Sequence, residues 1–341
     1  MIRLLQAMAG APHGGAETFF VRLALALGRA GQDQRIVIRR DPTRAALLRA
    51  SGIAPAELPF RRWLDPTTPL GFRRAIRDWR PRVVLTWMTR ATQLCPPGDF
   101  VHVARLGGYY DLRPYRRCQH LIGNTREICD FIVRAGWPAE RAHYLPNFVP
   151  DMRAQPVARA SLGTPADVPL VLALGRLHEN KAFDVLLAAL ALAPRAHLWL
   201  AGEGPLRAAL EVQARRLGIA ERVRFLGWRE DTPALLAAAD ILVCPSRHEP
   251  LGNVVIEAWS AGVPVVAAAS AGPAALIREG ETGLLVPIED AGALAAAIER
   301  LAGDAALGKR LAEAGRLAYA AEFSEGTVVA GYREFLERVA R

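Results

Sequence analysis

The strongest constraint on the fold is an alternation of short apolar segments with longer amphipathic segments, which runs through both halves of the chain. In the second half, five apolar runs predict strands, and the segments between them repeat apolar residues at helical spacing. The predicted strands are 170–174, 197–201, 223–226, 241–244 and 263–267, and the predicted helices are 183–193, 206–217, 232–239, 254–261 and 291–302. Strands that alternate with helices in this way indicate a parallel sheet with both faces covered.

The first half shows the same alternation less regularly. Its predicted strands are 2–6, 35–39, 82–87, 101–106 and 120–123. Helices are predicted over 17–29 and 126–135, the second capped by Thr125 and closed by Gly136. The segment from Pro55 to Pro69 is broken by proline and is predicted to be a loop.

A proline-rich segment separates the two halves. Five prolines, at positions 146, 150, 156, 165 and 169, fall in a stretch without long periodicity, which is typical of a linker. The predicted fold class is α/β, with two doubly wound Rossmann-like domains that face each other across a cleft. We expect domains at 1–150 and 151–322, followed by a helix over 323–341 that packs back on the first domain. Ligands of such sheets bind at the carboxyl ends of the strands, so the functional residues are expected there.

The composition excludes several classes of protein. With 51% hydrophobic and 23% charged residues, the chain is globular and not disordered. The longest uncharged apolar stretch, 261–277, is interrupted by glycine and proline, so no membrane-spanning helix is predicted. The chain begins MIRLLQAMAG without the apolar core of a signal peptide, and we therefore expect a cytoplasmic protein. The four cysteines, Cys95, Cys118, Cys129 and Cys244, lack the spacing of a zinc site or a disulfide framework.

The net charge of +9 is unevenly distributed. Residues 1–150 have a net charge of +12, whereas residues 151–341 have −3, which indicates an anionic partner for the first half. In that half, aromatic residues alternate with arginines over 60–64, 71–74 and 77–80. One interpretation is a surface on which Trp63, Phe72 or Trp79 enters the headgroups of an anionic membrane. The other is that Phe72 and Trp79, at helical spacing, pack inward. Nucleic acid is not an expected partner, because the chain has no run of five basic residues.

The loop after the first predicted strand contains Gly14 and Gly15 directly before a helix. Two glycines at a helix start let the backbone approach a phosphate, to which the helix offers its free N–H groups. The third glycine of a dinucleotide-binding fingerprint is missing. A tight strand-to-helix turn is the alternative interpretation.

Two cations follow the first strand of the second half. Arg176 leaves the end of the strand, and Lys181 is predicted to open the next helix. Both side chains can converge on the carboxyl edge of the sheet, where a pair of cations neutralises a diphosphate without a metal ion. Two solvated surface cations are the alternative.

The most informative segment spans Glu249 to Glu257. Asn253 is predicted to cap the helix that follows, so that the loop amides and the helix N-terminus point to one site for phosphate and hydroxyl groups. Carboxylates on either side of an anion-binding helix start suit the hydroxyl groups of a sugar. Exposed or helix-capping glutamates are the alternative.

Together these motifs resemble the retaining glycosyltransferases of family 4, which have the GT-B fold. The resemblance covers nearly the whole chain, through GGAE at 14–17, NTRE at 124–127, LPNFV at 145–149, GRLHENK at 175–181, AGEGPLRAAL at 201–210, FLGW at 225–228, PSRHEPLGNVVIEAWSAGVPVV at 245–266 and AGPAALIREGETGLLVP at 271–287. The variant of the signature around Leu251 and Asn253 is similar to that of bacterial enzymes that build lipopolysaccharide cores and other surface glycans.

The resemblance implies a role for each matching position. Arg176, Lys181 and Glu249 would be the catalytic residues: the two cations would neutralise the leaving diphosphate, and Glu249 would bind hydroxyls of the donor sugar. The residues implied to bind the donor also include Gly14, Gly15, Leu226, Leu251, Gly252, Asn253 and Glu257, with Glu257 on the ribose and the loop 226–228 near the base. The donor would be a UDP- or GDP-linked sugar, and no metal or other cofactor is implied. The acceptor would be a lipid-linked or lipopolysaccharide-type saccharide, and the enzyme would work at the inner face of the cytoplasmic membrane.

One position departs from the family's pattern. Many relatives carry a histidine where Gly107 stands here, and His102 is out of register with it. His13, Glu17, Arg105 and Tyr109 are the residues that could compensate or contact the acceptor. No catalytic base is therefore assigned.

Three other classes of function are alternatives to a glycosyltransferase. A nucleotide-sugar 2-epimerase of the same fold is the main alternative, although the linker motif and both glutamates favour transfer. A nicotinamide-dependent dehydrogenase would need the missing third glycine and an acidic residue where Arg39 and Arg40 stand. A non-catalytic binding module would not need Arg176, Lys181 and Glu257 together.

Overall fold

The computed structural model describes residues 2–11, 14–61 and 64–341. The chain divides into two units, one formed by Met1–Phe148 with Glu325–Arg341 and the other by Val149–Ser324. The sequence placed these divisions at 150 and 322.

The first unit is built on a seven-stranded sheet in the order β3-β2-β1-β4-β5-β6-β7, in which all neighbouring strands are parallel. Its strands are β1 (Leu4–Met8), β2 (Gln34–Arg39), β3 (Ala56–Leu58), β4 (Val83–Trp87), β5 (Val101–Leu106), β6 (His120–Gly123) and β7 (Ala142–Tyr144). Its α-helices are α1 (Gly15–Arg29), α2 (Pro42–Ala50), α3 (Thr67–Trp79), α4 (Met88–Leu94), α5 (Arg126–Arg134) and α13 (Glu325–Val339).

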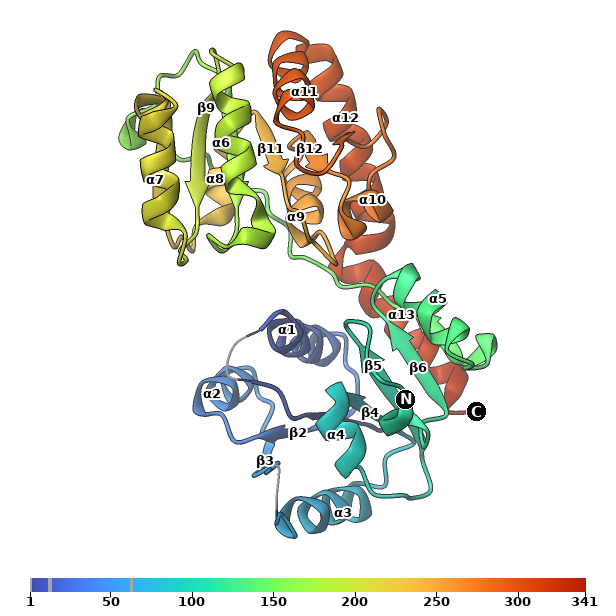
Figure 1. The fold of residues 1–341 in the computed structure, drawn as a ribbon. Helices are drawn as coiled ribbons and strands as arrows, with labels where there is room; N and C mark the ends of the chain where they lie inside the picture. The colour runs from blue at the N-terminus through green and yellow to red at the C-terminus, as the bar shows by residue number, and fades with distance from the viewer. Residues whose placement is uncertain (1, 12–13, 62–63) are drawn as a thin grey trace. The chain divides into compact units, whose positions relative to one another are not determined.

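Alternate residues of these strands point to opposite faces, and each face has its own helices. Leu4, Ile36 and Leu85 pack with α1, α2 and the last helix of the chain, α13. Leu5 and Val84 pack on the other face with α3 and α4. Figure 1 shows α13, in red, beside β6 and α5 of this unit, so the end of the chain completes the layer begun by α1.

The second unit has a six-stranded parallel sheet in the order β10-β9-β8-β11-β12-β13. Its strands are β8 (Leu170–Leu174), β9 (His197–Ala201), β10 (Val223–Gly227), β11 (Ile241–Cys244), β12 (Val265–Ala268) and β13 (Leu284–Val286). Its α-helices are α6 (Phe183–Leu192), α7 (Arg207–Arg216), α8 (Thr232–Ala238), α9 (Asn253–Ala261), α10 (Ala271–Leu276), α11 (Ala291–Gly303) and α12 (Ala305–Ala318). Helices α6, α7 and α11 cover one face, and α8 and α9 cover the other.

The α/β fold with two doubly wound sheets is confirmed. In each sheet the strand order reverses next to the first strand, between β1 and β4 and between β8 and β11. These crossover points are where sheets of this kind bind ligands, at the carboxyl ends of the strands.

The predicted loop from Pro55 to Pro69 is wrong. This segment contains β3 and the start of α3, in which Pro69 occupies the first turn, where a missing backbone N–H costs nothing. The interpretation of Phe72 as a membrane-inserting side chain is also wrong, because Phe72 is fully buried and packs edge-to-face on Phe60. Trp79 is half-buried, with the guanidinium groups of Arg3 and Arg35 over its ring.

Candidate active site

The crossover of the second sheet brings a lysine and a glutamate together. Lys181 ends a short 3-10 turn after β8, and Glu249 lies in the loop after β11, the strand that pairs with β8. The Nζ of Lys181 donates to the Glu249 carboxylate, and both side chains are largely buried, with 24% and 11% of their surface exposed. Two residues that the sequence assigned to one site therefore meet, although 68 positions separate them.

Two glycines allow this close packing. Gly175 lies beneath the lysine stem, because a Cβ at this position would be 3.3 Å from Lys181 Cε. Gly272 donates its N–H to the Glu249 carbonyl at 2.7 Å, and a Cβ there would lie only 2.6 Å from that oxygen. Any side chain at Gly272 would displace the loop that carries Glu249.

The helix after this loop begins differently from the prediction. Asn253 is not the N-cap of α9 but its first helical residue, and the cap is Gly252 in the left-handed conformation, with φ 69°. Glycine takes this conformation without the steric penalty that a Cβ brings. The Oδ1 of Asn253 is buried and has no hydrogen-bond partner among the residues that the structure describes. The first amides of α9 lack intrahelical acceptors and remain available to an anion.

The prediction that Lys181 opens a helix is wrong, because α6 begins only at Phe183, after Ala182 in a left-handed conformation. Arg176 is exposed and makes no ion pair with any described residue. Glu257 is half-buried, just over one turn into α9. At the end of β10, Leu226 is half-buried and Trp228 is 76% exposed.

In the first unit, the loop after β1 is held by Glu17. The backbone N–H of Ala11 donates to Glu17 Oε1 at 2.7 Å, and the Glu17 side chain is buried. A Cβ at Gly14 would lie 2.2 Å from Glu17 Oε2, so a side chain at this position would displace the Glu17 carboxylate. A Cβ at Gly15 would meet no described atom within 4 Å, which leaves its backbone open to a ligand. His13 lies outside the described residues.

Arg105 is a buried residue of the sheet rather than a surface group. Its Nε donates to the hydroxyl of Tyr332 in α13 at 2.8 Å, and its Nη2 donates to Asn147. Its guanidinium also lies 4.7 Å from the ring centres of both Phe19 and Trp87. The charge is thus dispersed over aromatic faces and amide and hydroxyl oxygens, which is how a buried arginine is stabilised.

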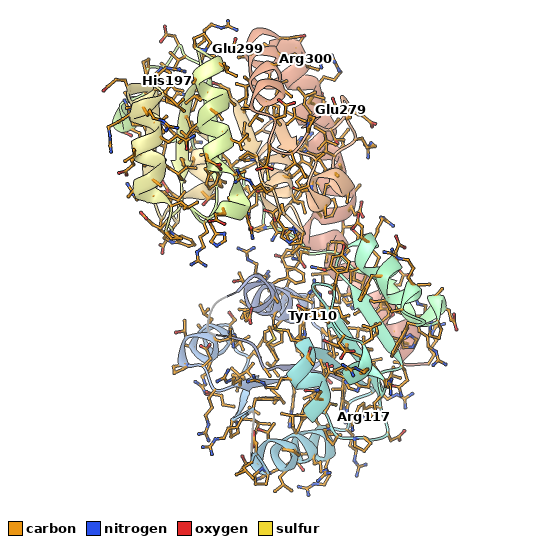
Figure 2. All side chains as sticks on the ribbon, viewed as in Figure 1. Tyr110, Arg117, His197, Glu279, Glu299 and Arg300 are labelled. Carbon is orange, nitrogen blue, oxygen red and sulfur yellow. The ribbon has the colours of Figure 1, made fainter. Side chains whose placement is uncertain are left out.

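The end of β5 presents other groups. Tyr109 is exposed, with its ring edge-to-face on Phe131. The pKa of Tyr110, labelled in Figure 2, is raised by burial and by the negative charge of Glu17, although Arg105 opposes this.

A Cβ at Gly107 would lie 3.8 Å from Nδ2 of Asn124, whose buried Oδ1 has no partner among the described residues. Asn124, which opens the NTRE motif, was not among the candidate site residues named from the sequence.

His102 lies in the body of β5 and does not replace the missing family histidine. Its Nε2 is 3.0 Å from the hydroxyl of Thr86, and its ring is buried. Burial lowers the pKa of His102 to about 4, and the positive charge of Arg117, labelled in Figure 2, contributes.

Two kinds of feature are absent from the described part of the chain. No helix there is both long and apolar enough to cross a membrane. Within the same residues, His, Cys, Asp and Glu side chains form no group of three or more with the geometry to hold a metal ion.

Both halves of the chain match known families. Residues 13–153 match the family described as Glycosyltransferase Family 4, and residues 168–304 match the family described as Glycosyl transferases group 1. Among solved structures, HepE from Anabaena, crystallised with UDP, is similar with a TM-score of 0.86 and 23% identity, covering 99% of this chain and all of that one. This likeness confirms the GT-B fold.

Two curated relatives align over almost their whole length. The lipopolysaccharide core biosynthesis glycosyltransferase LpsE of Rhizobium meliloti is 40% identical over 332 residues, which are 95% of this chain and 96% of LpsE. LpsD of the same bacterium, with the same description, is 36% identical over 330 residues, covering 96% of each chain. Since relatives this similar share the full extent of the chain, the protein belongs to glycosyltransferase family 4.

Proposed function

We propose that this glycosyltransferase moves a hexose-type sugar from a nucleoside-diphosphate sugar to a lipopolysaccharide-type or other surface-glycan acceptor. We further propose that the anomeric configuration is retained and that no metal ion is needed. The observation that carries the proposal is the pairing of Lys181 with Glu249 at the crossover of the second sheet, directly before the start of α9. A cation, a carboxylate and free helix amides in one place suit a ligand that contains both phosphate and hydroxyl groups.

The diphosphate of the donor would bind Arg176, Lys181 and the backbone amides of Leu251, Gly252 and Asn253. Preorganised cations and N–H donors stabilise the negative charge that develops on a leaving group. Arg176, Lys181 and the loop amides would together supply part of the positive potential that a divalent ion otherwise brings, and this supports metal independence.

Glu249 would accept hydrogen bonds from hydroxyls of the donor sugar, and Glu257 would accept them from the ribose. Because Lys181 neutralises Glu249, this carboxylate suits hydroxyl binding better than covalent attack on the sugar. Retention would then come from a front-face attack in which the leaving phosphate assists. The base would lie near Leu226, where the exposed ring of Trp228 offers a stacking surface.

The first unit would bind the acceptor, and the backbones of Gly14 and Gly15 would contact the donor. Glu17 would shape this loop through its bond to Ala11 rather than act on the substrate. Tyr109, which is exposed at the end of β5, is the side chain that we propose contacts the acceptor. Arg105 would act only through the side chains that it holds.

The class of acceptor is supported by the relatives, which are described as enzymes of lipopolysaccharide core biosynthesis. The net charge of +12 on residues 1–150 also suits an anionic glycan or membrane surface. We propose that the enzyme is cytoplasmic and binds the inner face of the cytoplasmic membrane.

A screen of UDP- and GDP-sugars by thermal shift tests the donor, since a ligand at 100 times its dissociation constant stabilises the fold by about 2.7 kcal/mol. The identified donor is then incubated with a truncated lipopolysaccharide acceptor, and free nucleoside diphosphate and product anomer are measured. A glycosyltransferase should release nucleoside diphosphate only when the acceptor is present. An epimerase-type isomerase would convert the donor sugar without any acceptor. Loss of activity in excess EDTA, restored by Mg²⁺ or Mn²⁺, would contradict metal independence.

A further inference from the structure

Arg247 lies two residues before Glu249 and commits all three guanidinium nitrogens to other parts of the second unit. Nη1 and Nη2 donate to the two carboxylate oxygens of Asp184 at 2.9 and 2.7 Å. Nη1 also donates to the carbonyl of Glu179 at 2.8 Å, and Nε donates to Glu289 at 2.7 Å. These bonds raise the pKa of Arg247, and the Arg247 guanidinium lowers the pKa of Asp184.

The partners of Arg247 lie on both sides of Lys181. Glu179 begins the 3-10 turn that ends at Lys181, and Asp184 lies in the first turn of α6. A backbone bond from His248 N to Asn180 O, at 3.2 Å, joins the same two segments. The loop that carries Glu249 is therefore hydrogen-bonded to the chain on both sides of Lys181.

The 3-10 turn that ends at Lys181 is followed by a residue with a strained backbone. Ala182 has a φ of 51°, a left-handed conformation that a residue with a Cβ adopts only when its surroundings impose it. Without the bonds to Glu179 and Asp184, the turn would be free to relax and to carry Lys181 away from Glu249. The Arg247 side chain is 28% exposed, and its bidentate pairing with Asp184 has the geometry that separates effective ion pairs from ordinary surface pairs.

We infer that Arg247 is a positioning residue that aligns Lys181 with Glu249 by clamping the loop after β11 to the turn after β8. Its effect on the reaction rests on the proposed function, whereas its effect on Lys181 does not. Arg247 does not act on the substrate, because its donors are already bound to Asp184, Glu179 and Glu289.

The chain offers a direct readout, because Lys181 and Lys309 are its only lysines. Acylation of both amines by acetic anhydride, followed by mass spectrometry, gives the reactivity of Lys181 relative to an internal standard. We expect Arg247→Gln, which adds no amine, to raise the Lys181 to Lys309 ratio about fivefold, as the loss of about 1 kcal/mol of ion-pair protection would. Glu249→Gln should raise the ratio as well, and Asp184→Asn should reproduce the effect of Arg247→Gln.

The matched control is Arg278→Gln, which removes a bidentate pair with Glu281 that lies within the same unit and contacts neither segment. It should leave the ratio unchanged and shift the melting temperature only slightly, because this pair is largely exposed. An unchanged ratio in both Arg247→Gln and Asp184→Asn would overturn the inference, even if both variants were destabilised.

Turnover provides the second readout. Arg247→Gln should lower kcat about 10- to 100-fold with a smaller change in KM for the donor, since a displacement of about 1 Å can cost 10²-fold. In a Lys181→Ala background, Arg247→Gln should lower kcat only slightly further. A full additional loss in that background would show that Arg247 acts elsewhere. If the wild type transferred no sugar, the proposed function would fail, and the acylation ratio would still decide the role of Arg247.

Discussion

The carboxylate of Glu249 accepts a hydrogen bond from the amine of Lys181, so the cation proposed to meet the donor's diphosphate is already paired within the protein. The two side chains come from the loops after two adjacent parallel strands, β11 and β8. A diphosphate that binds there must share Lys181 with Glu249. The pair therefore sets the affinity for the leaving group as well as the place where it binds.

The first prediction concerns this pair. Glu249→Gln should tighten the binding of free nucleoside diphosphate about fivefold, because it removes a repulsion of about 1 kcal/mol. It should also lower turnover, because the amide no longer offers a charged acceptor to the sugar hydroxyls. Isothermal titration and steady-state rates measure the two effects. Glu299→Gln, which removes a carboxylate paired with Arg195 in the same unit, is the control (Figure 2 labels Glu299). Weaker diphosphate binding in Glu249→Gln would show that Glu249 does not compete with the ligand for Lys181.

A second prediction concerns the two cations. Arg176→Ala and Lys181→Ala should each lower kcat about 10²- to 10³-fold, the usual effect of removing one preorganised donor to a developing charge. Arg176→Ala should leave the melting temperature unchanged, because Arg176 is exposed and makes no ion pair with the described residues. Lys181→Ala should lower it, because the largely buried Glu249 loses its counter-charge. Full activity of the double variant would exclude both residues from the mechanism.

The third prediction separates binding from chemistry at Glu257. Glu257→Ala should raise the dissociation constant of the donor about 10- to 150-fold, because a charged hydrogen bond contributes about 1.5–3 kcal/mol to the binding free energy. Glu257→Gln should be milder, since the amide oxygen still accepts one bond from the ribose. Titration with the nucleoside diphosphate alone is the measurement, because that ligand contains the ribose but no donor sugar. Equal affinity in wild type and Glu257→Ala would remove the ribose assignment.

A fourth prediction follows from the buried His102. Its pKa is about 4 in the folded protein against an ordinary value of 6.5, so the unfolded chain takes up the proton first as the pH falls. The stability that His102 contributes is complete above pH 6.5 and is lost between pH 6.5 and 4. Between pH 7 and 5 this loss is about 2 kcal/mol.

Urea unfolding at several pH values measures the effect of His102. His102→Gln keeps a neutral polar group near Thr86. This variant should therefore reduce the fall in the free energy of unfolding between pH 7 and 5. The remaining slope would include His143, whose pKa burial also lowers to about 4. Identical slopes in wild type and variant would show that His102 does not carry the effect.

The sequence predicted most strands because their residues are apolar on both faces, as β11 is in a parallel sheet. It missed the start of α3, although it noted the helical spacing of Phe72 and Trp79, because prolines near a helix start resemble those of a loop. Asn253 was assigned as a cap by residue preference, whereas the left-handed backbone at that point needs Gly252. The clamp made by Arg247 and the burial of Arg105 against Tyr332 could not be predicted, because both depend on partners brought from distant parts of the chain.

The last prediction concerns membrane binding by the first unit. Leu64 is 95% exposed and Leu70 is 60% exposed, close in sequence to Arg61 and to the exposed arginines of α3. Asp65 accepts bonds from the backbone N–H of Arg61, at 2.7 Å, and from the hydroxyl of Thr68, at 2.6 Å. Exposed leucines and arginines in one part of the chain suit an anionic lipid surface.

Co-sedimentation with liposomes tests this surface. The wild-type protein should sediment with vesicles that contain anionic lipid and should stay in solution with neutral vesicles. This binding should weaken steeply as the salt concentration rises, since each cation near the surface contributes about 1 kcal/mol. A variant with Arg61, Arg62, Arg73 and Arg74 changed to Ser should lose most of this binding, and Leu64→Ser should weaken it at constant charge. The control for net charge changes Arg215, Arg216, Arg310 and Arg316 to Ser, which removes the same four charges at exposed positions of α7 and α12. Equal partitioning to both lipids would show that binding does not depend on anionic lipid. Equal losses in the test and control variants would show that the attraction comes from overall charge and not from this surface, and either result would favour a soluble acceptor.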